Sequence, residues 1–562
     1  MNKIIQHEKN EERYLSSANK RIEKEDYLGA LRFLFSARSI NPDSLEVISS
    51  IADLYADMNA LELSNKFWFI YMDKAPKEDL GRAYEELAIN YFYLDNFWAS
   101  SYYFHKKLDV DGFISKENLS QEVIDFFSGE EIKKTAYRIA YPFDLADYTF
   151  DTKKAKRLIS IGGFAEGALA LEKIPRERLD EDTAGELATC YFMNDELDKA
   201  EEICRFSLEK HGENITAFCH LSTINELRED YFNSDYYYKK ALSLRKGTLS
   251  EAYKIATCAI EREDHLVVKE CLETILKDRP YENAMRFFYA LSLSNLGDYK
   301  SSYEQLKISY QIDPSDVAVK FFMRYVENLS NGCGDESNLT PFKYVKDIPE
   351  EIAKDWKKKI KTLIKNPEKI SSALKKSEWQ EILEWGIKND DSSVMRDSAF
   401  VLSFSITPYT KKVLFETMLS PDGREELKRV LIYVTLISGI KEKFGVVAGS
   451  FYLKIRPKKL LCEKDKIFGD LYLSAYALCL SKMAFFDVES LDKIAKITDK
   501  IYKKFKGKIT NAEVSNEEIA GLILSQCEFK KYSNDQSVTR IFSITLDKLK
   551  LLKDQLQGEK ND

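Results

Sequence analysis

Residues 283–316 read NAMRFFYALSLSNLGDYKSSYEQLKISYQIDPSD, and this stretch decides the fold of the first part of the chain. Apolar residues recur at the spacing of an amphipathic helix on both sides of a polar turn, Gly297-Asp298-Tyr299. Pro314 then ends the second helix, because proline lacks the backbone donor that would continue it. The stretch therefore predicts two antiparallel helices joined by a short turn.

The same pattern recurs upstream with a period of 34 residues. Each repeat places a small or apolar pair early in its first helix, at Leu187-Ala188, Leu221-Ser222, Ile255-Ala256 and Tyr289-Ala290. A small residue at this point lets two helix backbones approach, while larger residues at i+3 and i+4 fill the groove between them. A fixed period of this length predicts a stack of helical hairpins.

The repeat units cover most of the first 330 residues. The regular units are 181–214, 215–248, 249–282 and 283–316, and earlier units lie at 11–44, 45–78 and, after a two-residue slip, 81–114. Residues 115–180 break the register, and we interpret them as an irregular insertion plus one degenerate unit; whether they separate two sub-arrays stays open. Residues 317–329 predict a helix that caps the last repeat, because a terminal repeat otherwise exposes its apolar face.

These units resemble the tetratricopeptide repeat (TPR) family, in which a small residue of the first helix, an alanine of the second helix and a late proline recur at matching offsets. The resemblance spans residues 11–316 and departs from the family where another residue replaces the second-helix alanine, at Ser64, Ser100, Ser234, Val268 and Ser302. It implies an all-α superhelix over residues 1–330 and a protein-binding function.

The resemblance also implies that positions 2, 5, 9, 12 and 13 of each unit face the concave groove. In the regular units we select from these positions Thr189, Phe192, Cys219, Thr223, Tyr253, Thr257, Ile260, Phe287 and Leu291. This row is mostly apolar and uncharged, which suits a peptide or helix with aromatic or aliphatic anchors. The alternative is that several of these side chains only pack between repeats. Asn19 alone matches the family's carboxylate clamp, so binding of a chaperone tail is disfavoured.

A break at residues 331–348 separates the repeats from a second domain, 349–562. Its patterning predicts short helices that look like pairs of an α-solenoid of the HEAT type, without a measurable period. One segment, FGVVAGSFYLKIRP at 444–457, is rich in β-branched and aromatic residues and predicts a small β-hairpin. We therefore expect a TPR superhelix followed by a mainly helical domain.

The net charge of −8 hides a difference between the two parts. Residues 341–562 hold 41 basic and 32 acidic residues, whereas residues 1–340 hold 43 and 60. Such a difference indicates either separate partners or two surfaces that attract each other. A basic patch, Lys454, Arg456, Lys458 and Lys459, could contact nucleic acid or an acidic protein surface, although simple solvation is the favoured explanation.

Signals for catalysis and for metal binding are missing from the sequence. The five histidines are dispersed, and no metalloprotease, phosphate-loop or nucleophile-elbow motif occurs. The nine cysteines are never spaced as C-x-x-C, which favours free buried thiols (Cys190, Cys204, Cys219, Cys258, Cys271, Cys333, Cys462, Cys479 and Cys527). No run approaches eighteen apolar residues, so we expect no membrane span and a cytoplasmic location.

The sequence therefore predicts a non-enzymatic adaptor without cofactor or metal that presents a TPR groove to a protein or peptide partner of unknown identity. The alternative is a regulatory protein in which the repeats sense a partner and the module at 349–562 binds nucleic acid.

Overall fold

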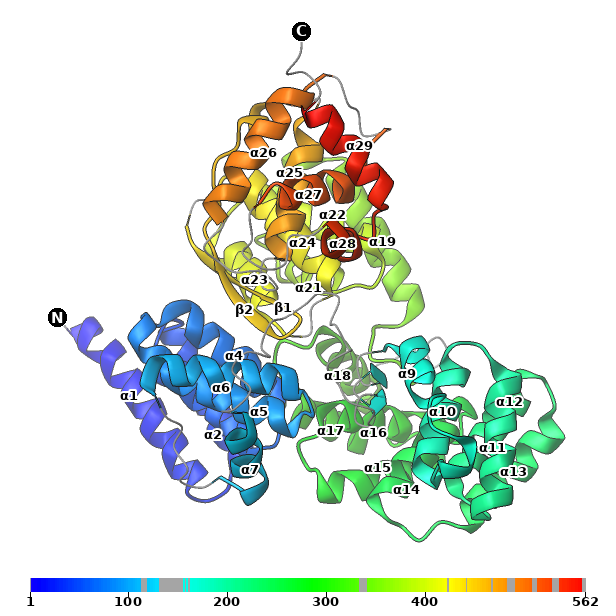
Figure 1. Ribbon diagram of the computed structural model, residues 1–562. Helices are drawn as coiled ribbons and strands as arrows, with labels where there is room; N and C mark the ends of the chain where they lie inside the picture. Colours follow the sequence, from blue (N-terminus) through cyan, green and yellow to red (C-terminus); the bar gives the residue numbers. More distant parts are fainter. Residues whose placement is uncertain are drawn as a thin grey trace.

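The part of the chain that the structure describes is helical apart from one two-stranded antiparallel sheet (Figure 1). This computed structural model describes residues 2–112, 119–130, 155–156, 158–159, 162–332, 341–421, 424–440, 442–465, 468–482, 491–507, 513–527 and 535–557. Its helices form three lobes that follow one another along the chain (Figure 1). The prediction of an all-α fold with antiparallel helix pairs in the first part of the chain is confirmed.

The first lobe contains three helix pairs and one further helix. These are α1 (Asn2–Ile22), α2 (Tyr27–Ile40), α3 (Leu45–Asp57), α4 (Leu61–Lys74), α5 (Leu80–Tyr93), α6 (Phe97–Asp111) and α7 (Gln121–Glu130). Each pair corresponds to one unit of the sequence pattern, and the pairs stack side by side (Figure 1).

The second lobe continues the array after the irregular stretch, most of which lies outside the described residues. Its helices are α9 (Phe164–Leu171), α10 (Glu181–Met193), α11 (Leu197–His211), α12 (Ile215–Leu227), α13 (Tyr231–Ser243), α14 (Leu249–Glu261), α15 (His265–Asp278), α16 (Asn283–Asn295), α17 (Tyr299–Ile312) and α18 (Val317–Ser330). Helix α18 covers the segment predicted as a cap and packs against α17.

The turn within each repeat has one recurring backbone feature. The fifteenth residue of each of the seven units has a positive φ, between 53° and 81° (Glu25, Asn59, Asp95, Asp195, Glu229, Glu263 and Gly297). The following residue is often an aspartate whose carboxylate caps the second helix, as Asp230, Asp264 and Asp298 do. The left-handed residue reverses the chain, and the cap then starts the second helix of the pair.

The serines that replace the family's second-helix alanine have a structural role. Ser100 donates to the carbonyl of Ala88 (2.6 Å), and Ser302 donates to that of Ala290 (2.7 Å). Ser234 makes the same bond to the carbonyl of Ser222 at 2.9 Å. Each hydroxyl thus ties the second helix to the first at their closest approach, and a buried polar group finds its partner inside the hairpin.

The third lobe contains the remaining elements. They are α19 (Glu350–Ile364), α20 (Ile370–Ala373), α21 (Ser377–Gly386), α22 (Ser392–Phe404), α23 (Pro408–Leu419), α24 (Glu425–Ile437), β1 (Phe444–Ala448), β2 (Phe451–Ile455), α25 (Gly469–Ser481), α26 (Leu491–Phe505), α27 (Asn516–Ser525), α28 (Asp535–Phe542) and α29 (Leu546–Gln557). The predicted hairpin is confirmed: β1 pairs with β2, and the two turn residues, Gly449 and Ser450, both have positive φ.

The hairpin turn packs on the first lobe. The buried Tyr103 hydroxyl donates to the carbonyl of Ser450 (2.8 Å) and accepts the backbone N–H of Tyr452 (3.0 Å). Lys454 donates to the carbonyl of Asp73 at 2.6 Å. One apolar core extends from the first lobe into the third, so these two lobes, which are distant in sequence, fold against each other.

The first and second lobes meet at the end of α17. The Tyr55 hydroxyl donates to the carbonyl of Ile312 (2.5 Å), and Lys66 donates to Ser315 (3.2 Å). The third lobe reaches the second through Lys320 of α18, which lies 3.5 Å from Glu384 of α21. All three lobes therefore converge around the turn between α17 and α18.

We predict that Tyr55→Phe weakens this junction. The substitution leaves the buried Ile312 carbonyl without its donor, which should lower the free energy of unfolding by about 1–2 kcal/mol. Urea unfolding followed by tryptophan fluorescence measures the change. Tyr71→Phe is the matched control, because it removes a hydroxyl of neighbouring α4; an equal loss in both variants would contradict a special role for Tyr55.

Candidate functional site

The first helices of the second lobe line the inner side of its curve. Lys254 of α14 and Asp182 of α10 form an ion pair at 3.8 Å although their units are not adjacent. Such a contact brings α10 and α14 together across α12, so the array is concave on the face that carries these helices. The residues that the sequence placed in the groove belong to this same set of helices.

Six of the nine predicted groove residues keep access to solvent. Thr257 is exposed, and the others are half-buried: Thr189, Phe192, Thr223, Tyr253 and Ile260. The threonine hydroxyls are already paired within their helices, as in the bond from Thr223 to the carbonyl of Cys219 (3.1 Å). The open part of the row therefore offers mainly apolar contact.

His220 is an additional member of this row that the sequence did not single out. Its Nε2 lies 3.1 Å from the Thr189 hydroxyl, and its ring packs 6.1 Å from that of Phe192. Protein surrounds the ring although one edge stays accessible, and this burial, with the positive charge of Lys254, lowers the pKa of His220 to about 4. The imidazole is therefore neutral at physiological pH.

The other three predicted residues, Cys219, Phe287 and Leu291, are buried. Cys219 is 8% exposed, whereas Phe287 and Leu291 have no exposed surface. Phe287 packs against Phe322 of α18, with ring centroids 5.4 Å apart. At Phe287 and Leu291 the packing interpretation applies, and neither side chain is available to a ligand.

A segment of the chain itself joins α18 in the core cluster that contains Phe287 and Leu291. Residues 341–346, which belong to the stretch predicted as a linker, lie against α15, α16 and α18. The Asn295 side chain accepts the backbone N–H of Phe342 (2.6 Å) and donates to its carbonyl (2.9 Å). The Phe342 ring, 3% exposed, packs edge-on against Phe322 at 5.1 Å. The array therefore holds a non-helical segment by its backbone at Phe342 and by an aromatic anchor.

A second aromatic anchor follows two residues later. The Tyr344 hydroxyl lies 2.9 Å from Nδ1 of His265, and its ring packs 6.4 Å from that of Phe288. Lys346 then pairs with Asp316 at 3.0 Å. The backbone N–H of Val345 bonds to the carbonyl of Lys343 at 2.8 Å, so the chain turns at Tyr344, and Phe342 and Tyr344 enter two separate neighbouring contacts.

Sequence reasoning overlooked Asn295, although a signal for it existed. Asn295 is the thirteenth residue of its unit, and the same offset gives Met193, Leu227 and Glu261 in the other units. Met193 and Leu227 are 53% and 59% exposed, which is unusual for large apolar side chains. The position that binds the segment at α16 is thus open and apolar at α10 and α12.

The predicted basic patch does not come together as four free cations. Lys454 binds the carbonyl of Asp73 in the first lobe, while Arg456 and Lys459 are exposed and Lys458 is half-buried. Lys454 therefore contacts the acidic first part of the chain, one of the two partners that its charge suggested.

The described residues also bear on metal binding, free thiols and membrane spans. They contain no group of three His, Cys, Asp or Glu side chains placed to hold a metal ion. Eight cysteines are buried free thiols, and Cys333 lies outside the described residues. Within the same ranges, no helix is both long and apolar enough to cross a bilayer.

Comparison with known proteins gives a likeness of fold. No protein-family model and no curated protein matches the chain. Among solved structures, YrrB, a TPR protein with an unusual peptide-binding site, is 16% identical, with 32% of this chain and 88% of that one covered and a TM-score of 0.24. The yeast Tom70 is 12% identical, with 89% and 97% covered and a TM-score of 0.27.

We predict that Asn295→Ala releases the segment at 341–346. Loss of both hydrogen bonds to Phe342 should speed amide hydrogen exchange at Phe342 and its neighbours about tenfold, because each bond contributes on the order of 1 kcal/mol. Hydrogen exchange read by mass spectrometry checks this. Asn194→Ala, in the turn of an earlier repeat, should leave the exchange of the segment unchanged; unaltered exchange in Asn295→Ala would contradict the clamp.

Protonation of His220 should make the stability of the folded state depend on pH. The unfolded ring takes up a proton near pH 6.5, whereas the folded ring stays neutral down to about pH 4, so the folded state loses stability as the pH falls between these values. We expect His220→Gln to remove about 1 kcal/mol of the stability difference between pH 7 and pH 5. Urea unfolding at both pH values measures it, with His211→Gln as the surface control, and an unchanged difference would exclude this role.

Proposed function

We propose that the chain is a non-enzymatic scaffold whose second lobe binds a non-helical segment of a protein partner along the first helices of its repeats. The observation that carries the proposal is the Asn295 clamp on the backbone of Phe342. The bound segment is part of the same chain, so it serves as an internal example of the ligand class.

The contacts of this segment suggest how a partner is recognised. The paired hydrogen bonds from Asn295 read only backbone atoms, which every peptide offers. Selectivity comes from the aromatic anchors, because the pocket against Phe322 and the one at His265 and Phe288 each accept a ring. Main-chain bonds for affinity and pockets for alternate side chains are the usual division in recognition of extended peptides.

The open end of the groove supplies the surface for a partner. Met193 and Leu227 are exposed there, and Phe192, Tyr253 and Ile260 belong to the same first helices. Exposed apolar side chains gathered on a concave face mark interaction sites in soluble proteins. Charged side chains are present as well, including the Lys254–Asp182 pair, so the surface combines apolar contact with a few fixed charges.

Protein binding is favoured over nucleic-acid binding by the position of the basic patch. Lys454 is occupied by the first lobe, which leaves Arg456 and Lys459 as its exposed cations. Nucleic-acid surfaces generally gather more phosphate contacts than two cations supply. The patch at 454–459 therefore gives little support to the nucleic-acid alternative.

A synthetic peptide tests the binding mode directly. The peptide TPFKYVKDI, residues 340–348, should bind in trans to a full-length variant whose own anchors are removed, Phe342→Ala with Tyr344→Ala. Adding Asn295→Ala should weaken this binding about tenfold, since two hydrogen bonds are lost. Fluorescence anisotropy with the labelled peptide gives both dissociation constants. A scrambled peptide that binds equally well would overturn the proposal.

Co-purification of a partner from cell extract tests whether the open end of the groove binds that partner. Met193→Asp with Leu227→Asp places charge in the groove without disturbing the core, because both side chains are largely exposed. Co-purification of a partner from native cell extract should fall at least several-fold. Phe232→Asp is the matched control, since Phe232 is 82% exposed on the second helix of a repeat. Equal recovery with both variants would falsify the groove assignment.

A further inference from the structure

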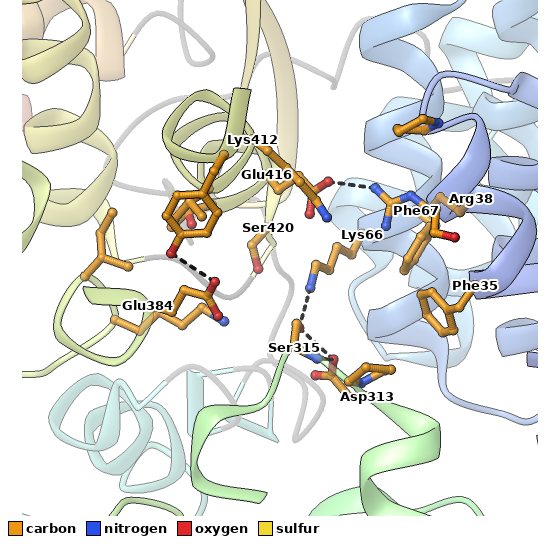
Figure 2. A pocket seen from close by; sticks show the side chains of 18 of the residues that line it. Phe35, Arg38, Lys66, Phe67, Asp313, Ser315, Glu384, Lys412, Glu416 and Ser420 are labelled. Atoms are coloured by element: carbon orange, nitrogen blue, oxygen red, sulfur yellow. Dashed lines mark hydrogen bonds and ion pairs between the residues drawn. The ribbon is translucent and has the colours of Figure 1, made fainter. Parts of the chain in front are cut away.

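A cavity of about 510 Å³ lies where the three lobes meet (Figure 2). The first lobe contributes residues of α2, α3 and α4, the second lobe contributes the turn between α17 and α18, and the third contributes α21 and α23. A volume of this size falls in the range of small-molecule sites, roughly 300–1,000 Å³. Because the walls come from three lobes, the cavity exists only in the folded whole.

Basic side chains outnumber acidic ones in the cavity wall. The wall contains Arg38, Lys66, Lys320, Lys388 and Lys412 against Asp313, Glu384 and Glu416. Two pairs cancel, since Arg38 lies 2.7 Å from Glu416 and Lys320 lies 3.5 Å from Glu384. The remaining charges are those of three lysines and Asp313, which leaves an excess of two positive charges.

Asp313 is already satisfied by its neighbours. Its carboxylate accepts the Ser315 hydroxyl at 2.6 Å and the Ser315 backbone N–H at 2.9 Å. Burial acts to raise the pKa of Asp313, but the charges of Lys66 and Lys388 and the bonds from Ser315 together hold that pKa below its usual value. The carboxylate is therefore ionised and still leaves the excess positive charge in place.

The three lysines lack a carboxylate of their own. Lys66 donates to the neutral Ser315 hydroxyl at 3.2 Å, as Figure 2 shows. Within the described ranges, Lys388 and Lys412 make no ion pair and no side-chain hydrogen bond. Lys388 is exposed to water, yet desolvation by the cavity wall together with the charge of Lys66 lowers its pKa, against the opposing charges of Asp313, Asp316 and Glu384. An anion bound here would offset both the desolvation of Lys388 and its repulsion by Lys66.

An aromatic wall stands beside these cations. Phe35 and Phe67 meet edge to face with ring centroids 6.0 Å apart, and Tyr55 packs 5.6 Å from Phe67. The Arg38 guanidinium lies over the Phe67 ring at 4.9 Å. Figure 2 shows Phe35 and Phe67 on the first-lobe side of the cavity. Phe67 is only 4% exposed and Phe35 is half-buried, so Phe35 supplies most of the open aromatic surface. The part of the cavity beside Phe35 thus suits a flat ring, and the part beside the lysines suits an anionic group.

We propose that this cavity binds a small organic phosphate that carries a flat ring, of the size of a mononucleotide. The phosphate would sit among Lys66, Lys388 and Lys412, and the ring would lie against Phe35 and Phe67. Such a ligand touches the first and third lobes, so its binding stabilises their present arrangement by mass action. The site is separate from the peptide groove and does not depend on it.

Calorimetric titration of the full-length chain tests the proposal with three probes: adenosine monophosphate, adenosine and inorganic phosphate. The monophosphate should bind saturably, and each of the two fragments should bind at least tenfold more weakly. Lys388→Met should weaken binding of the monophosphate about tenfold or more, because a charge-assisted hydrogen bond is lost. Lys358→Met is the matched control, since it removes an exposed lysine of α19 and should change nothing.

Lys412→Met is a second variant, in case Lys388→Met does not fold. It should also weaken binding of the monophosphate, and its circular dichroism spectrum should stay unchanged. Absence of saturable binding by all three probes overturns the proposal. Equal affinity for phosphate and for the monophosphate overturns the role of the aromatic wall. A phosphoserine peptide that binds where the monophosphate does not would identify a protein segment as the occupant, and it would also overturn the proposal.

Discussion

The hydrogen bond from Tyr55 to the carbonyl of Ile312 is the contact on which the arrangement of the lobes depends. Ile312 is the last residue of α17, and the final carbonyls of a helix have no partner within it. A buried carbonyl at such a place needs a donor from elsewhere, and the first lobe supplies it. The turn that follows, with Asp313 and Ser315, is thereby fixed between the lobes and becomes a wall of the central cavity.

The same requirement, that a buried polar group must find a partner, shapes the repeats and the groove. Within the hairpins, Ser100 and Ser302 bond to the carbonyl of the facing helix. At the groove, Asn295 bonds to the backbone of Phe342. In both places helix packing holds the donor or acceptor in position before its partner arrives.

Much of the second lobe could be predicted from the sequence because its helix packing is local. The period, the small residues and the late prolines concern residues within one or two units of each other, so periodicity alone locates the hairpins. The exposure of the groove residues was harder to predict from the sequence. Thr189, Tyr253 and Thr257 keep access to solvent, but Phe287 and Leu291 do not, because α18 and a segment that returns from beyond the array contribute to the core around them. A repeat pattern contains no information about that return.

The sequence by itself determined the helical hairpins, their order and the small β-hairpin, since these follow from short-range spacing and turn chemistry. Only the tertiary structure decided that residues 341–346 lie against α15, α16 and α18, that Lys454 contacts the first lobe, and that Lys66 and Lys388 line one cavity. The physical reason is the same in each case. These contacts join residues that are tens to hundreds of positions apart, and their formation depends on which buried groups remain unpaired after the hairpins have formed.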